Sequence, residues 1–336
     1  MLRYTALLTS TADLLISTTF VLCSNIPTAC IIGVAFGISY VLVRKYLQPR
    51  RQNVVSPMTL RFADLKTCKS IVSGNILHHG SCLTFLESRA IPNKRLIDSF
   101  GIENSFTSTD EAYCKEFRGK AANLLKVKER DWKGLMTFAG KTIRDGLSIA
   151  SHDGNNACIQ LVPIVHTTVF RFMLLLMFPQ KKTEIDTGAA AIVAEKINAL
   201  WMTLKKTPAS PCCEDRVILG RELWKIFPEA DQTLRGNPLN LILPAYEDMW
   251  RVVLRCFIEV LYRGGNERQS WRQLLAEFAA YPTKSTFQAF DSGASVQHIV
   301  QETLRLYPPT KSIYRAVIPE EWDIWPDIIA ADITAL

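Results

Sequence analysis

The sequence lacks the cysteine patterns that hold metals or build disulfide frameworks. Nine cysteines occur in 336 residues, and none of them forms a C-x-x-C pair. A structural zinc site therefore has no support. The odd number of cysteines and their irregular spacing also argue against a disulfide framework, so a reducing compartment is expected.

The sequence also lacks a basic stripe with interleaved aromatic residues, although the net charge is +7. Nucleic acid is therefore not an expected partner. There is no internal repeat, no low-complexity run and no long linker, and strand signals are few. A hydrophobic content of 48% with 21% charged residues is typical of a folded protein with an ample core. Together these features predict one mainly α-helical domain.

One uncharged run lies near the N-terminus. Residues 26–43, IPTACIIGVAFGISYVLV, are long enough to cross a bilayer core, and four basic residues lie within 44–51. Such a basic flank favours the cytosolic side for the residues after the run. We expect a lead segment (1–25), a transmembrane anchor (26–43), a basic linker (44–59) and a domain (60–336). The lead segment could instead be a second membrane segment or a signal-like start, and the run 26–43 could be a buried core helix.

Helical patterns dominate from residue 61 onward. Ser108-x-x-Glu111 has the arrangement of a capping box, and apolar residues then recur three and four apart. The apolar stretch CIQLVPIVHTTVFRFMLLLMF is interrupted by proline, histidine and arginine, which favours a buried core helix over a membrane span. Further helices are expected over 240–262, 267–281 and 294–306. The best strand signal is SIYRAVI, residues 312–318.

An acid–base pair occurs in QETLRLYPPT, residues 301–310. Glu302 and Arg305 are three apart and would project from one face of a helix, where they can form an ion pair. Bulky apolar residues surround them, and Pro308-Pro309 ends the helix. This setting favours a buried pair whose members satisfy each other's charge, although an exposed surface pair is the alternative.

The stretch ETLRLYPPT resembles the K-helix signature of the cytochrome P-450 monooxygenases, which are haem-thiolate enzymes. LRLYPPTKSIYRA is similar to the fungal branch of that family that acts in secondary-metabolite biosynthesis. Three other stretches carry the same resemblance, so that it spans nearly the whole chain. RLIDSFGIENSFTSTDEAYCKEFRGKA is similar to the segment that leads through the C helix, LNLILPAYEDMWRVVLRCFIEV to the I helix, and PDIIAADITAL to the stretch before the K′ region.

The resemblance implies a P-450-like fold, mainly α with a minor β-sheet, and roles for particular residues. Glu302 and Arg305 would lock the K helix to the segment that carries the haem loop. Arg118 and Arg315 would meet the haem propionates. Glu247 matches the I-helix acid, whereas Asp248 stands where the family has the threonine that helps deliver protons to bound oxygen. An exposed acidic turn is the alternative for these two residues.

The resemblance also implies the cofactor, the partners and the location. Haem would bind, and NADPH would supply electrons through a reductase partner. The substrate would be a small lipophilic molecule, and the domain would lie on the cytosolic side of the endoplasmic reticulum membrane behind a single-pass anchor.

One part of the family pattern is missing from this sequence. The family's iron is held by a cysteine thiolate in a loop after the K helix, but no cysteine follows Cys256, which lies on the expected I helix. We therefore expect a chain truncated before the haem loop, with no axial cysteine, whose enzymatic activity is left open. Three functions remain: a monooxygenase in its full-length form, a catalytically inactive remnant, or a membrane-anchored helical binding protein unrelated to haem.

Overall fold

The computed structural model describes residues 59–75, 83–152, 160–181, 185–206, 213–231, 233–290, 293–318 and 327–335. All of these belong to the larger of two compact units, Ser56–Leu336. The expected lead segment and anchor, and the linker up to residue 58, lie outside the described residues. Within the described ranges, no helix is long and apolar enough to cross a membrane.

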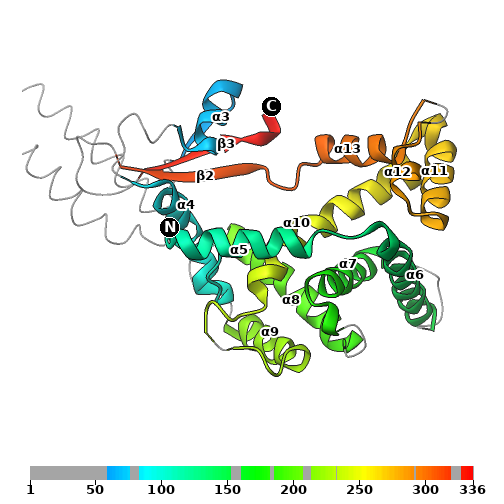
Figure 1. Cartoon of the computed structure of the whole chain (residues 1–336), viewed down its shortest axis with the longest axis horizontal. Coiled ribbons are helices and arrows are strands. Elements are labelled where there is room, and N and C mark those ends of the chain that lie inside the picture. The colour runs from blue at the N-terminus through cyan, green and yellow to red at the C-terminus, as the bar shows by residue number, and fades with distance from the viewer. Residues whose placement is uncertain are drawn as a thin grey trace, which may run out of the picture. The chain divides into compact units, whose positions relative to one another are not determined.

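The described part of the chain is mainly helical and carries one small sheet, as the sequence predicts (Figure 1). The α-helices are α3 (Leu65–Ser73), α4 (Phe85–Phe100), α5 (Glu111–Leu124), α6 (Glu129–His152), α7 (Leu161–Met177), α8 (Thr187–Lys206), α9 (Cys213–Ile226), α10 (Leu239–Ile258), α11 (Arg268–Ala280), α12 (Lys284–Gln288) and α13 (Val296–Leu306). The strands are β1 (Leu60–Phe62), β2 (Ser312–Val317) and β3 (Asp327–Asp332). Short 3₁₀-helices η3 (Pro179–Lys181), η5 (Gly265–Glu267) and η6 (Ile333–Ala335) and the π-helix η4 (Glu259–Arg263) complete the described elements.

The start of α5 differs from the prediction. Asp110, and not Ser108, is the N-cap, and its carboxylate accepts a hydrogen bond from the Tyr113 amide at 3.0 Å. The Ser108 hydroxyl instead donates to Glu103, at 3.0 Å. The reason is that an aspartate next to the first helical residue reaches the free amides of the first turn directly.

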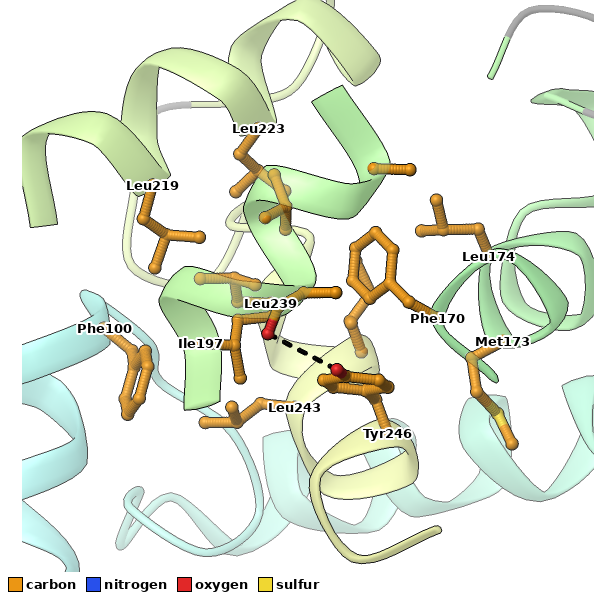
Figure 2. Packing of buried hydrophobic residues seen from close by; sticks show 14 of the residues in the cluster. Phe100, Phe170, Met173, Leu174, Ile197, Leu219, Leu223, Leu239, Leu243 and Tyr246 are labelled. Atoms are coloured by element: carbon orange, nitrogen blue, oxygen red, sulfur yellow. Dashed lines mark hydrogen bonds between the residues drawn. The ribbon is translucent and has the colours of Figure 1, made fainter. Parts of the chain in front are cut away.

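The main core lies where α7, α8, α9 and α10 meet (Figure 2). The apolar stretch with the interrupting proline, histidine and arginine forms α7, and its side chains Phe170 and Leu174 are fully buried. Phe170 meets Tyr246 of α10 edge-on, with ring centroids 5.2 Å apart. The Tyr246 hydroxyl donates to the Ala194 carbonyl of α8 at 3.3 Å, so its polar end is satisfied within the core.

The sheet joins the two ends of the described region. Its strand order is β1-β3-β2; β1 is parallel to β3, and β2 is antiparallel to β3. Helix α3 packs on this sheet through Cys68 and Ile71, which are fully buried with Ile329 and Ala331. Strand β2 confirms the prediction from SIYRAVI, whereas β1 and β3 have no counterpart among the predicted elements.

Candidate functional site

Two buried arginines flank one aromatic ring where α4 packs against β2. The guanidinium carbon of Arg89 lies 5.6 Å from the centroid of the Phe85 ring, and that of Arg315 lies 4.9 Å from the same centroid. Arg89 is 8% exposed and Arg315 is 7% exposed. Fully buried arginines are rare unless a carboxylate or another anion pairs with them. The pair Arg89–Arg315 is therefore an unusual polar feature of the described residues.

The hydrogen bonds of these arginines leave donors unused. Arg315 donates to the carbonyls of Tyr314 and Val72, at 3.2 and 3.3 Å. Within the described ranges, Arg89 reaches only the Cys114 sulfur, at 3.8 Å. The Nε atoms of both arginines are buried and have no hydrogen-bond partner there. Neither arginine forms an ion pair with any described residue, so the described chain does not compensate the positive charge of this site.

Arg118 of α5 approaches the same site. Its Nε donates to the Cys114 carbonyl of its own helix at 3.1 Å, and the side chain is exposed. Burial lowers the pKa of Arg89, and the positive charge of Arg118 lowers it further. Burial likewise lowers the pKa of Arg315, and the charge of Arg89 adds to that effect. Arg89 thus lies within electrostatic reach of both arginines that the sequence resemblance singles out.

Local structure explains how Arg89 is positioned. Thr84 caps α4, and Glu87 closes the capping box by accepting from the Thr84 amide at 2.9 Å. This fixes the first turn of α4, so that Phe85 and Arg89, four residues apart, share one face. On β2, Arg315 and its neighbour Ala316 are both buried. No sequence signal marks Arg89, since a single arginine in a helical pattern is ordinary.

The acidic residues of α10 are not an exposed turn. Glu247 is 2% exposed, and its Oε1 lies 2.5 Å from Nη1 of Arg251. The Nη1 atom also donates to the main-chain carbonyl of Glu247, and Nη2 donates to Oδ1 of Asn198 at 3.1 Å, so Arg251 is shared between the carboxylate and two other acceptors. Burial raises the pKa of Glu247 to about 7, although Arg251 opposes the shift. Helix α10 continues through Pro244 without ending.

Asp248 is half-buried and meets a hydroxyl from another element. The Thr310 hydroxyl, in the segment between α13 and β2, donates to Oδ2 of Asp248 at 3.4 Å. Burial raises the pKa of Asp248, with Arg251 and Lys205 opposing that shift. Helix α10 contains no threonine of its own, so the hydroxyl that contacts Asp248 comes from outside the helix.

The Glu302–Arg305 pair forms as predicted, but it is not buried. Two hydrogen bonds of 2.6 and 2.7 Å join the guanidinium to the carboxylate. The side chains are 54% and 68% exposed, which corrects the expectation of an interior pair. The reason is that α13 turns Thr303 inward, while the apolar neighbours Leu304 and Leu306 are themselves 40% and 48% exposed.

Metal-ligating side chains do not gather in the described residues: no group of three or more histidine, cysteine, aspartate or glutamate side chains is placed to hold an ion. Cys68 and Cys114 are fully buried, and Cys256 of α10 is half-buried. A scan of family models and a search of curated proteins found no match to this chain.

Proposed function

We propose that this chain is a relative of the cytochrome P-450 monooxygenases and that Arg89, Arg118 and Arg315 hold the propionates of a haem. One observation carries the proposal: two guanidiniums are buried around one ring, with unused donors and no carboxylate partner among the described residues. A ligand that brings two carboxylates would satisfy both charges and both free Nε atoms. The sequence resemblance, which assigns propionate roles to Arg118 and Arg315, supports the same ligand.

The residues present fit the carboxylate end of haem. Arginine offers planar donor pairs that match carboxylate oxygens, and the Phe85 ring supplies an apolar surface beside the two buried cations. For the iron we assign no ligand among the described residues. The sulfur atoms of Cys68 and Cys114 contact main-chain carbonyls, at 3.1 and 3.5 Å, inside separate packed regions.

A bound haem with thiolate ligation supplies oxygen activation. The chain's own contribution on α10 would be to hold protons. Near neutral pH Glu247 is partly protonated, since its pKa is about 7. The Asp248 carboxylate accepts from Thr310, and burial raises its pKa.

A second candidate is a haem-binding relative without oxygenase activity. The observation that favours it is the replacement of the I-helix hydroxyl by Asp248, whose charge is costly to bury. For either candidate we propose attachment to the endoplasmic reticulum membrane. In the active form, a small lipophilic substrate and a reductase that draws on NADPH would complete the system.

The test compares haem with haem dimethyl ester, whose carboxylates are blocked. The full chain in detergent is titrated with each pigment, and binding is followed by Soret absorbance. We expect haem to bind the unaltered chain more tightly than the ester. Arg89→Gln or Arg315→Gln should weaken haem binding by roughly 10- to 100-fold, as expected for a lost hydrogen bond between charged groups.

The controls test whether the haem carboxylates are the groups that these arginines bind. Binding of the ester should change little in the same two variants, and Arg268→Gln, at an exposed position of α11, should leave haem binding unaltered. Equal affinity for haem and its ester would contradict the proposal. So would haem binding that is indifferent to both substitutions.

A further inference from the structure

A cavity lies between α5, the C-terminal ends of α7 and α9, and the start of α10. Its volume is about 290 Å³, and it is open to solvent. That volume is at the lower end of the range for small-molecule sites. Arg89, Arg118 and Arg315 are not among the residues that line it, so an occupant would be a second ligand, independent of the proposed haem.

Phenylalanine rings form part of the cavity wall. Phe117 of α5 and Phe178, the C-cap of α7, both line it and are half-buried. Phe227 also lines it, is 3% exposed, and meets Phe178 with ring centroids 4.7 Å apart, so it supports that ring from the core side. The faces of such rings carry negative potential and attract cations. The wall therefore suits an apolar or cationic ligand better than an anion.

One side of the cavity already holds a cation of the chain itself. Arg235 and Tyr113 both line it, and the guanidinium carbon of Arg235 lies 4.2 Å from the centroid of the Tyr113 ring. Nη2 of Arg235 also donates to Glu103 at 2.8 Å and to Asp110 at 3.3 Å. An aromatic face and two carboxylates thus surround one positive charge. Because one cation meets two carboxylates, one negative charge is left in excess.

The other charged residues that line the cavity are exposed. They are Glu116 and Lys120 of α5 and Glu229, which follows α9. Glu116 forms no ion pair with any residue of the described ranges. Two carboxylates and one ammonium add a second negative charge to the excess left at Arg235. Helices α7 and α9 end here and α10 begins here, so two negative helix ends outnumber one positive end.

We propose that this cavity binds a small organic cation of the methylated ammonium class. The charge of such a cation lies beneath methyl groups, so the cation is weakly hydrated and can contact the rings of Phe117 and Phe178 directly. The excess of carboxylates compensates its charge. A neutral apolar molecule would gain from the rings but not from the carboxylates, and an organic anion would be repelled by them.

The experiment uses probes of one shape that differ in charge. They are choline, which is a cation, its neutral carbon analogue 3,3-dimethyl-1-butanol, and the anion 3,3-dimethylbutanoate. Each is titrated calorimetrically into the full chain in a nonionic detergent. We expect choline to bind roughly fivefold or more tightly than the alcohol, because only the cation gains from the ring faces and the carboxylates. The anion should bind more weakly than the alcohol.

Two charge substitutions should change choline affinity in opposite directions. Glu116→Gln should weaken binding and Lys120→Gln should strengthen it, each by roughly twofold to fivefold, since water screens exposed charges. Their affinity for the alcohol should stay the same, which shows that the cavity is still folded. Phe117→Leu removes a ring face but keeps an apolar side chain, so it should reduce the preference for choline over the alcohol. Glu214→Gln, at the opposite end of α9, and Phe290→Leu, at an exposed position outside the cavity, should leave choline affinity unaltered.

Glycerophosphocholine distinguishes a free cation from the headgroup of a membrane lipid. We expect it to bind more weakly than choline, because its phosphate meets the carboxylates, and this result would assign the cavity to a free cation. Equal or tighter binding would support the cation site and assign it to a lipid headgroup. Two results would overturn the inference: choline that binds no more tightly than the neutral alcohol, or choline affinity that does not move in opposite directions in Glu116→Gln and Lys120→Gln.

Discussion

His166 and Glu247 are both buried and influenced by Arg251, and their pKa values are displaced in opposite directions. The His166 ring centroid lies 3.8 Å from that of Trp250, and burial, reinforced by the charge of Arg251, lowers the pKa of His166 to about 4. Burial raises the pKa of Glu247 to about 7. In the folded protein both groups are therefore mostly neutral at pH values between these two.

The two groups should give opposite dependences of stability on pH. Between pH 4.5 and 7 the folded state retains the Glu247 proton that the unfolded chain loses, so this contribution to stability falls as pH rises. Between pH 4 and 6.5 the unfolded chain protonates His166 while the folded state does not, so this contribution rises with pH. In the unaltered chain the two contributions largely cancel.

Substituting either residue should reveal the pH dependence of stability that the other residue contributes. We compare the free energy of unfolding by urea at about pH 4.5 and about pH 7. Relative to the unaltered chain, Glu247→Gln should shift the difference by about 2 to 3 kcal/mol in favour of the higher pH, and His166→Gln by a similar amount in favour of the lower pH. Shifts of the same sign in both variants would refute the assignment.

Single residues also show where sequence reasoning ends. Arg118 and Arg315 stand out in the sequence because they lie in stretches that resemble a known family. Arg89 does not, since its environment is created by the packing of α4 on β2, which nothing in the local sequence encodes. The predicted burial of Glu302 and Arg305 is wrong for a related reason: apolar neighbours in sequence show that a side chain can be covered, but not which face of a helix is covered.

At the scale of the element, α13 shows which polar contacts stabilise a helix. Its N-cap Ser295 is 2% exposed, and the hydroxyl accepts from the His298 amide at 3.2 Å. The Glu302–Arg305 pair lies on the open face of the same helix. Exposed ion pairs contribute little, because water screens the charges and two long side chains lose freedom.

We therefore expect the Ser295 cap to contribute more to the free energy of unfolding than the Glu302–Arg305 pair. Ser295→Ala should lower the free energy of unfolding by about 1 kcal/mol, since one amide of the first turn loses its acceptor. Glu302→Ala should have no measurable effect, and adding salt should not change that result. Urea unfolding of the two variants side by side provides the measurement. A larger loss in Glu302→Ala would mean that the pair is covered in solution.

The elements are predictable to the extent that their pattern is local. Helices α10, α11 and α13 follow the expected ranges closely. The spacing of their apolar residues marks all three in the sequence, and the Pro308-Pro309 pair also marks the end of α13. Strand β1 has only three residues and pairs with β3, more than 260 positions away in the sequence, so no local pattern marks it. The partner of a strand is decided by the tertiary fold.

At the scale of the whole molecule, the anchor stays a prediction, because 26–43 lies outside the described residues. It rests on an uncharged run and its basic flank. A chain that begins at Gln52 should leave the membrane fraction after carbonate extraction, whereas the full chain should stay in it. Membrane retention of the shortened chain at the level of the full chain would assign attachment to another segment.

Gly74 influences the site formed by Arg89 and Arg315, although it contacts neither guanidinium through a side chain of its own. This residue ends α3 with a φ of +81°, and a Cβ there would lie 2.4 Å from a carbon of the Phe85 ring. Any side chain at this position would both strain the backbone and displace the ring on which Arg89 and Arg315 rest. In a mutational scan of haem binding, residue 74 should therefore behave like a member of the proposed haem site, although it carries no functional group. For protein engineering, it is a position from which the spacing of the two guanidiniums can be changed while the charge of the protein stays the same.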